Sequence, residues 1–371
     1  MTDKPGLRAG QRRNVGRSTV QLTALSLGSA ALGGLYRDLS DGEAQAAVAA
    51  AWDAGMRYFD TAPHYGHTKA ELRLGEALRC YPRGEYVLST KVGRHYVPRT
   101  TPYDGREGWH NPLPFEARYD YSGDGMLRSF EDSLRRLDIG PVDIVLIHDI
   151  GRMTHGERHA HYWRQLTDGG GFRALAQLRD SGVVKAIGLG VNESAVILDA
   201  MAEFDLDCAL LAGRYTLLEQ AALEELLPAC AARQVSLMLG GVFNSGILAR
   251  GLASASGGHG HASELKFNYT EAPAGIVARV AQLDALCQRH QVPLAAVALQ
   301  FPYAHPAVAT VLTGARSATE VRENLAAFEQ PLPAALWSDL RDAGLLDARA
   351  PTPAAAASTR ASTCASSLQE V

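Results

Sequence analysis

The sequence is poor in cysteine and has no excess of positive charge. Its 371 residues include five scattered cysteines, none of them in a C-x-x-C pair, and the formal net charge is −4. An odd number of isolated thiols does not build a disulfide framework and is typical of a reducing compartment. A slightly acidic chain offers no cationic surface to hold nucleic acid or an anionic membrane.

Long apolar runs are also missing. No apolar stretch reaches the roughly 20 residues that a transmembrane helix needs. The opening residues, MTDKPGLRAGQRR, contain no apolar core of a signal peptide. We therefore expect a soluble cytoplasmic protein that binds neither membranes nor nucleic acid.

Short apolar runs alternate with helix-length segments along most of the chain. The runs are Ala24–Leu27, Arg57–Asp60, Tyr86–Lys91, Val142–Ile147, Val183–Leu189, Cys208–Leu211, Val235–Leu239 and Thr310–Thr313. The helical segments are Gly42–Ala54, Ala70–Arg79, Gly125–Leu137, Phe172–Ser181, Gln220–Arg233 and Ile276–His290. This alternation indicates parallel strands joined by right-handed crossovers. No G-x-G-x-x-G follows the first run, as an open dinucleotide-binding sheet would require, so we predict a closed α/β barrel, the (β/α)8 TIM barrel.

The pattern indicates a single domain with long loops. We expect an N-terminal extension at residues 1–20, the barrel at 21–349 and a disordered low-complexity tail at 350–371. Two unusually long connections, His95–Gly123 and Gly251–Asn268, follow the third and seventh strands. Loops after barrel strands build the active site, so we interpret the first as a substrate wall and the second as a cofactor lid.

Four polar residues lie at or just beyond the ends of neighbouring predicted strands. Asp60 ends the second strand, Lys91 the third and His148 follows the fourth, while Tyr65 is on the loop after Asp60. Each residue alone at such a position is more often structural than catalytic. Their joint placement at one barrel mouth is what predicts a catalytic site.

The four side chains suit proton transfer. A free tyrosine has a pKa of about 10, and a nearby ammonium such as Lys91 lowers it. The Asp60 carboxylate keeps a buried lysine charged, and His148 can hydrogen-bond a substrate oxygen as charge develops there. The set contains no metal ligand cluster and no covalent nucleophile. It therefore favours hydride transfer coupled to proton transfer.

At these residues the sequence resembles the aldo-keto reductases, over about residues 20–330. The motifs are DTAPHYG (Asp60–Gly66), ELRLGEAL (Glu71–Leu78), STKVG (Ser89–Gly93), LIHD (Leu146–Asp149) and GARSATEVRENL (Gly314–Leu325). The resemblance implies that Tyr65 is the general acid/base, Lys91 lowers its pKa, Asp60 pairs with Lys91 and His148 positions the substrate oxygen. It also implies a nicotinamide cofactor that lies extended across the barrel mouth.

Further stretches resemble one branch of that family, the L-fucose and D-threo-aldose 1-dehydrogenases and pyridoxal 4-dehydrogenase. They are DYSGDGMLRSFEDSLRRL, GLGVNE, LLAGRYTLLEQ and GGVFNSGILA. The resemblance implies hydride transfer from the cyclic hemiacetal carbon of an aldose to NAD or NADP, giving a lactone. The alternatives are oxidation of pyridoxal, NADPH-dependent reduction of small aldehydes or ketones, and a non-catalytic nicotinamide-binding subunit. The sequence fixes neither the substrate nor the oligomeric state.

The resemblance also implies a cofactor site, although several of its usual residues differ here. The predicted contacts are Asn192 for the carboxamide, Phe243, Asn244, Ser245 and Gly246 for the pyrophosphate, Glu323 and Asn324 for adenine, and Gly314 and Arg316 near the adenosine ribose. Val191 stands where many members of the family have serine, and Ala212 or a neighbour stands where many have glutamine. Gly240 and Gly241 occupy the region where many members have an aromatic residue that stacks on the nicotinamide.

The adenosine end favours NAD over NADP. NADP-specific members of the family place cationic or hydroxyl groups at the positions of Gly314, Ala315 and Glu320, which here are small or acidic. Glu320 would repel a 2'-phosphate. Arg316 is the one cation in reach, and it suits either a phosphate or a ribose.

Two aromatic residues are candidates for substrate contact. Tyr36 follows the first strand, and Trp109 lies in the long third loop, where it could stack on a sugar face or pin the loop to the barrel. A separate histidine group, His155, His159 and His161, has partly zinc-like spacing, but no cysteine or carboxylate completes a ligand set. We interpret it as a surface loop cluster and predict no metal site.

Overall fold

The eight predicted strands form a closed parallel barrel. The structure is a computed structural model that describes residues 6–250, 265–268 and 270–353. The barrel strands, in their order around it, are β3 (Leu25–Gly28), β4 (Tyr58–Asp60), β5 (Val87–Val92), β8 (Ile144–His148), β9 (Ala186–Val191), β10 (Cys208–Ala212), β11 (Ser236–Gly240) and β14 (Val308–Gly314). Strand β14 pairs with β3 and closes the ring. The predicted TIM barrel is confirmed.

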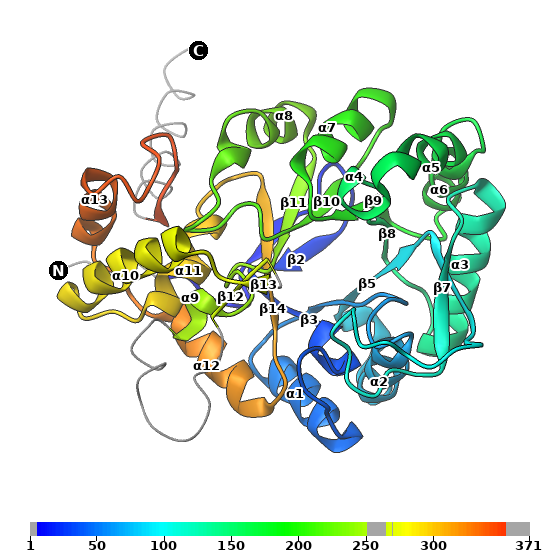
Figure 1. Cartoon of the computed structure of the whole chain (residues 1–371), viewed down its shortest axis with the longest axis horizontal. Helices are drawn as coiled ribbons and strands as arrows, with labels where there is room; N and C mark the ends of the chain where they lie inside the picture. The colour runs from blue at the N-terminus through cyan, green and yellow to red at the C-terminus, as the bar shows by residue number, and fades with distance from the viewer. Residues whose placement is uncertain (1–5, 251–264, 269, 354–371) are drawn as a thin grey trace, which may run out of the picture.

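Helices surround this ring (Figure 1). They are α1 (Asp41–Asp53), α2 (Lys69–Leu78), α3 (Gly123–Leu137), α4 (Arg152–His155), α5 (His159–Leu166), α6 (Gly171–Asp180), α7 (Ser194–Glu203), α8 (Leu226–Arg233), α9 (Ile247–Arg250), α10 (Ala274–Arg289), α11 (Leu294–Tyr303), α12 (Ala318–Glu329) and α13 (Ala334–Asp342). The predicted helix Gln220–Arg233 is shorter than expected: a 3-10 turn at Ala221–Leu223 precedes α8. Pro228 explains the late start, because a missing N–H is tolerated in the first turn of a helix.

An antiparallel hairpin closes the amino-terminal end of the barrel. It consists of β1 (Arg12–Asn14) and β2 (Gln21–Thr23), and Val15, Val20 and Leu22 join the apolar cluster inside the barrel. The N–H of Gly16 donates to Ser236 Oγ at the start of β11. The hairpin therefore leaves the carboxyl end of the strands as the open end, where barrel sites lie.

The long segment after β5 is largely a second hairpin rather than an irregular loop. Strands β6 (Arg94–Pro98) and β7 (Phe115–Tyr119) pair antiparallel, and Trp109 in their connection pairs with Leu35 after β3. The segment therefore reaches from β5 past the end of β4 to the loop after β3.

Most of the predicted lid and tail lies outside the described residues. Of the lid only residues 265–268 are described, with a short pairing of β12 (Lys266–Phe267) and β13 (Thr270–Glu271). Of the tail only residues 350–353 are described. Within the described part of the chain, no helix is both long and apolar enough to cross a membrane.

Candidate active site

The structure brings the four predicted catalytic residues together. Asp60 is the last residue of β4, Lys91 is next to last in β5 and His148 ends β8. The Lys91 ammonium donates to Asp60 Oδ2 at 2.7 Å and lies 4.8 Å from the centre of the Tyr65 ring. The Tyr65 and His148 rings meet edge to face, with their centres 6.1 Å apart.

The pair of Asp60 and Lys91 is buried and fully hydrogen-bonded. Their exposed fractions are 3% and 1%. Ser89 Oγ donates to Asp60 Oδ1 at 2.7 Å, and Lys91 also donates to the carbonyl of Thr61 at 2.9 Å. Gly190 makes room for the lysine, because a Cβ there would come within 3.0 Å of Lys91 Cε. Buried charges are tolerated when they are paired and hydrogen-bonded in this way.

The loop that carries Tyr65 is held by a close backbone approach. A Cβ on Gly66, whose φ is 63°, would lie 2.2 Å from the carbonyl oxygen of Gly33. Only glycine fits there, since the position requires both a left-handed backbone and the absence of a side chain. Gly66 therefore fixes the loop against the segment after β3 and holds Tyr65 over the barrel mouth.

Opposing effects set the pKa of Tyr65. Burial raises the pKa of Tyr65 to about 12, while Lys91 lowers it and Asp60 raises it. Lys91 lowers the pKa, in the direction expected from the sequence, but burial is the larger effect and the net shift is upward. Burial lowers the pKa of Lys91, yet Asp60 and Tyr65 outweigh it and leave that pKa above its usual value. At neutral pH the site therefore holds a charged lysine and a protonated tyrosine.

His148 is kept neutral. Burial lowers its pKa well below the usual value, and the positive charges of Arg94 and Lys91 act in the same direction. A neutral imidazole can donate or accept one hydrogen bond at each nitrogen, according to its tautomer. This suits contact with a substrate oxygen that carries no full charge.

The candidate substrate residues occupy different parts of the mouth. Trp109 is buried, and its ring centre lies 6.0 Å from that of Tyr65. Tyr36 is 38% exposed, with the Lys266 ammonium 5.3 Å from its ring centre. Trp109 therefore lies next to Tyr65, whereas Tyr36 faces the β12 segment.

Sequence reasoning missed His64, the residue before Tyr65. Its ring centre lies 5.8 Å from that of His148 and 5.3 Å from that of Trp109. Its Nδ1 is 2.9 Å from the Tyr96 hydroxyl, and burial lowers its pKa well below the usual value. Its position inside the same DTAPHYG motif was the signal that could have identified it.

The interpretation of the histidine group after β8 as a surface cluster is wrong for His155 and His159, whereas His161 is exposed as expected. His155 and His159 are buried, with exposed fractions of 5% and 6%. His155 Nε2 lies 2.9 Å from the Tyr121 hydroxyl, and His159 Nδ1 lies 3.0 Å from the carbonyl of Ile150. These are internal hydrogen bonds that fix the segment behind β8. In the described residues no three potential metal ligands are grouped together.

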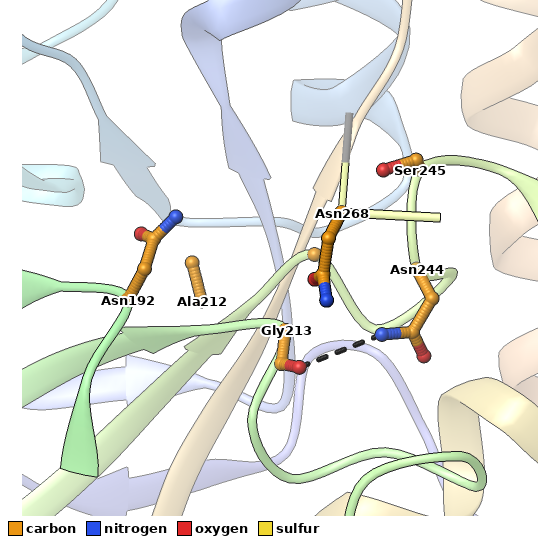
Figure 2. Close-up of a pocket in the computed structure, with 7 residues that line it drawn as sticks. Asn192, Ala212, Gly213, Asn244, Ser245 and Asn268 are labelled. Carbon is orange, nitrogen blue, oxygen red and sulfur yellow. Dashed lines mark hydrogen bonds between the residues drawn. The ribbon is translucent and has the colours of Figure 1, made fainter. Parts of the chain in front are cut away.

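A small pocket at the same end of the barrel brings together part of the predicted cofactor set. Its lining residues are Asn192, Ala212, Gly213, Gly241, Asn244, Ser245 and Asn268 (Figure 2). Asn244 donates weakly to the carbonyl of Gly213 at 3.5 Å, and its Oδ1 is buried with no partner among the described residues. An unpaired buried amide oxygen fits a ligand that brings its own donor, such as a carboxamide.

Arg214, which sequence reasoning did not identify, connects two sides of this pocket. Its guanidinium donates to the carbonyl of Asn192 at 2.9 Å and to Asn268 Oδ1 at 2.8 Å. It therefore joins the end of β9 to the β12 segment. The stretch LLAGRYTLLEQ contains this arginine, but nothing local shows which residues it reaches.

The predicted pyrophosphate turn, Phe243–Gly246, is tighter than expected. Asn244, Ser245 and Gly246 all have positive φ, of 45°, 62° and 95°. The N–H groups of Asn244 and Gly246 donate to the carbonyls of Gly241 and Phe243. These two amides are therefore used within the turn rather than offered to a ligand.

The predicted adenosine residues follow β14. Gly314 is exposed at its end, and Glu323 is exposed and Asn324 half-buried on α12. Arg316 is clamped by Glu320, with Nε and Nη2 donating to Oε1 at 3.0 and 2.7 Å. The one cation expected to reach a cofactor phosphate is therefore already paired with a carboxylate.

The fold and site together define a TIM barrel with a buried lysine–carboxylate pair beside a tyrosine and a histidine at its open end. The model of the Aldo/keto reductase family matches residues 24–344, so the chain belongs to that family, whose members use nicotinamide cofactors. The chain is 48% identical over 351 residues to a pyridoxal 4-dehydrogenase from Microbacterium luteolum, covering 92% of this chain and 99% of the relative. It is 39% identical over 336 residues to a D-threo-aldose 1-dehydrogenase from a Pseudomonas species, covering 90% and 96%.

Solved structures support the fold. A glycerol dehydrogenase from Gluconobacter oxydans superposes with a TM-score of 0.70 at 21% identity, over 93% of this chain and 98% of that one. An aldo-keto reductase from Bacillus halodurans in its holo form gives a TM-score of 0.65 at 24% identity, over 91% and 97%. Identities this low establish the barrel architecture alone.

The charge on Lys91 should control the pH dependence of oxidation. Because Tyr65 must lose its proton to act as a base, kcat/KM should rise with pH from neutral into the alkaline range. Lys91→Met removes the group that lowers the Tyr65 pKa, so activity near pH 8 should fall by about 10²- to 10⁴-fold. The measurement is a pH–rate profile of both proteins in the oxidative direction.

Lys185→Met is the matched control, because Lys185 is 59% exposed in its side chain and pairs with Asp143 just before β8. Its profile should coincide with that of the unmodified protein. If kcat/KM instead reached a plateau above an apparent pKa near 7, and did the same in Lys91→Met, this account of Tyr65 would be contradicted.

Proposed function

We propose that the chain oxidises a cyclic hemiacetal to a lactone with a nicotinamide cofactor. The observation that carries the proposal is the buried Asp60–Lys91 pair next to Tyr65, with neutral His148 facing it. This arrangement can remove a hydroxyl proton without a metal. The names of the two relatives, at 48% and 39% identity over nearly the whole chain, support a dehydrogenase of this kind.

The residues divide the reaction between them. Bound NAD⁺ or NADP⁺ supplies the hydride acceptor for the hemiacetal C–H bond. Tyr65, deprotonated, takes the hemiacetal O–H proton while the C–O bond becomes the lactone carbonyl, and it later releases that proton to solvent. Lys91 stabilises the tyrosinate, Asp60 keeps the lysine in place, and His148 hydrogen-bonds the reacting oxygen.

A pyridoxal-like substrate is our first candidate. Pyridoxal carries an aldehyde next to a hydroxymethyl group and can close to a cyclic hemiacetal. Trp109 and His64 give the mouth beside Tyr65 an aromatic wall, which suits a flat ring. A free aldose of the L-fucose or D-threo type is the second candidate, supported by the 39% relative. Reduction of small carbonyl compounds is the remaining alternative.

We infer that NAD is the preferred cofactor. Asn192 would lie beside its nicotinamide, Asn244 and Ser245 beside its pyrophosphate, and the residues after β14 beside its adenosine half. Glu320 forms an ion pair with the Arg316 guanidinium, and its carboxylate adds a negative charge where a 2'-phosphate would lie. The pair therefore disfavours NADP and leaves a ribose hydroxyl acceptable.

A substrate screen tests the proposed reaction. Pyridoxal and free aldoses are each incubated with NAD or NADP, absorbance is followed at 340 nm, and the product is identified as lactone or acid. At least one hemiacetal should be oxidised, and Tyr65→Phe should lower the rate by about 10²-fold or more while NADH binding persists. Tyr81→Phe, which changes a tyrosine stacked on Trp52, is the control and should retain full activity.

Failure of every hemiacetal together with rapid NADPH oxidation by simple aldehydes would replace this proposal with the reductase alternative. Activity that survives Tyr65→Phe would instead remove Tyr65 from the mechanism.

Cofactor preference is tested at Glu320. Glu320→Gln should release Arg316 and remove the opposing charge, so kcat/KM for NADP relative to NAD should rise by about 10- to 100-fold. Adding Arg316→Ala should reverse most of that gain, because the cation that Glu320→Gln releases toward the phosphate is then removed. An unmodified protein that already prefers NADP would show that the pair does not set the preference.

A further inference from the structure

A charged pair that the proposed mechanism does not use lies beside His148. Asp149 follows the last residue of β8, and Arg94 is the first residue of β6. Arg94 Nη2 forms a short ion pair with Asp149 Oδ2, and only 4% of Arg94 is exposed. The pair therefore joins the two loops that flank the mouth at this point.

The Asp149 carboxylate faces the catalytic group. Its Oδ2 lies 3.5 Å from His148 Nε2, and its negative charge contributes to raising the pKa of Tyr65. The residue has a φ of 47°, and its N–H donates to the carbonyl of Gly190 at 2.9 Å. Aspartate and asparagine tolerate this left-handed conformation better than most residues, so the backbone directs the side chain without great strain.

One side of the Asp149 carboxylate is accessible to a ligand. The Asp149 side chain is 22% exposed, and in the described part of the chain its Oδ1 makes no hydrogen bond, whereas both oxygens of Asp60 are used. Nε of Arg94 is also buried without a partner there. Burying a charged pair costs free energy when some of its hydrogen-bonding groups stay unpaired. A ligand that binds here would supply the missing hydrogen bonds.

We propose that Asp149, held by Arg94, accepts a hydrogen bond from a substrate hydroxyl that lies beside the reacting hemiacetal carbon. The inference rests on the proposed function and identifies a specificity residue for it. When His148 Nε2 contacts the reacting oxygen, a neighbouring hydroxyl comes next to the carboxylate. Both candidate substrates have such a group, at C2 of an aldose and at the ring carbon beside the aldehyde-bearing carbon in pyridoxal.

The test compares each active hemiacetal with its analogue that lacks this hydroxyl: an aldose with its 2-deoxy form, and pyridoxal with its 3-deoxy form. In the unmodified protein, kcat/KM should be about 10- to 100-fold higher for the hydroxylated compound. Asp149→Asn, which suits the same backbone, should lose most of that advantage, whereas any effect of the lost charge on Tyr65 should change kcat/KM for both substrates by the same factor. Asp149→Gly, which relieves the positive φ, should show the same pattern if the asparagine variant folds poorly.

Asp143→Asn is the matched control, because Asp143 is a buried carboxylate paired with Arg83 just before β8. Its preference for the hydroxylated substrate should equal that of the unmodified protein. Equal losses on both substrates in the Asp149 variants would mean a structural role and overturn the inference alone. If the unmodified protein oxidises no hemiacetal, both this inference and the proposed function are wrong.

Discussion

The ion pair between Lys91 and Asp60 is the interaction on which the site depends. Removing two charges from water costs several kcal/mol for each ion, and the pair is tolerated because Ser89 and the carbonyl of Thr61 complete its hydrogen bonds. The pair also needs space in the interior, and Gly190 provides it because a side chain there would crowd Lys91. The same positive charge opposes the effect of burial on Tyr65 and helps to keep His148 neutral.

Much of the barrel and the centre of the site could be predicted from the sequence. Parallel strands covered on both faces are apolar throughout, so a run such as Val142–Ile147 followed by a histidine reveals both a strand and its carboxyl end. Parallel strands of a barrel place those ends at one mouth, and this brought Asp60, Lys91 and His148 together before any contact was known.

The contacts between distant residues could not be predicted. Arg94 and Asp149 are 55 positions apart, and no local pattern pairs them. The segment around His155 and His159 has a polar composition, yet each of these histidines makes one hydrogen bond in the interior, to the hydroxyl of Tyr121 and the carbonyl of Ile150. The net pKa shift of Tyr65 could not be predicted for a related reason: the charge of Lys91 is visible in the sequence, while the degree of burial is a property of the packed mouth.

Isotope transfer tests the central claim most directly. A hemiacetal that carries deuterium at the reacting carbon is oxidised with NAD, and the reduced cofactor is examined by NMR or mass spectrometry. The account predicts that the deuterium appears on the nicotinamide ring and that the remaining product is the lactone. Deuterium released to water, with an unlabelled cofactor, would contradict direct hydride transfer in a site built around Tyr65 and Lys91.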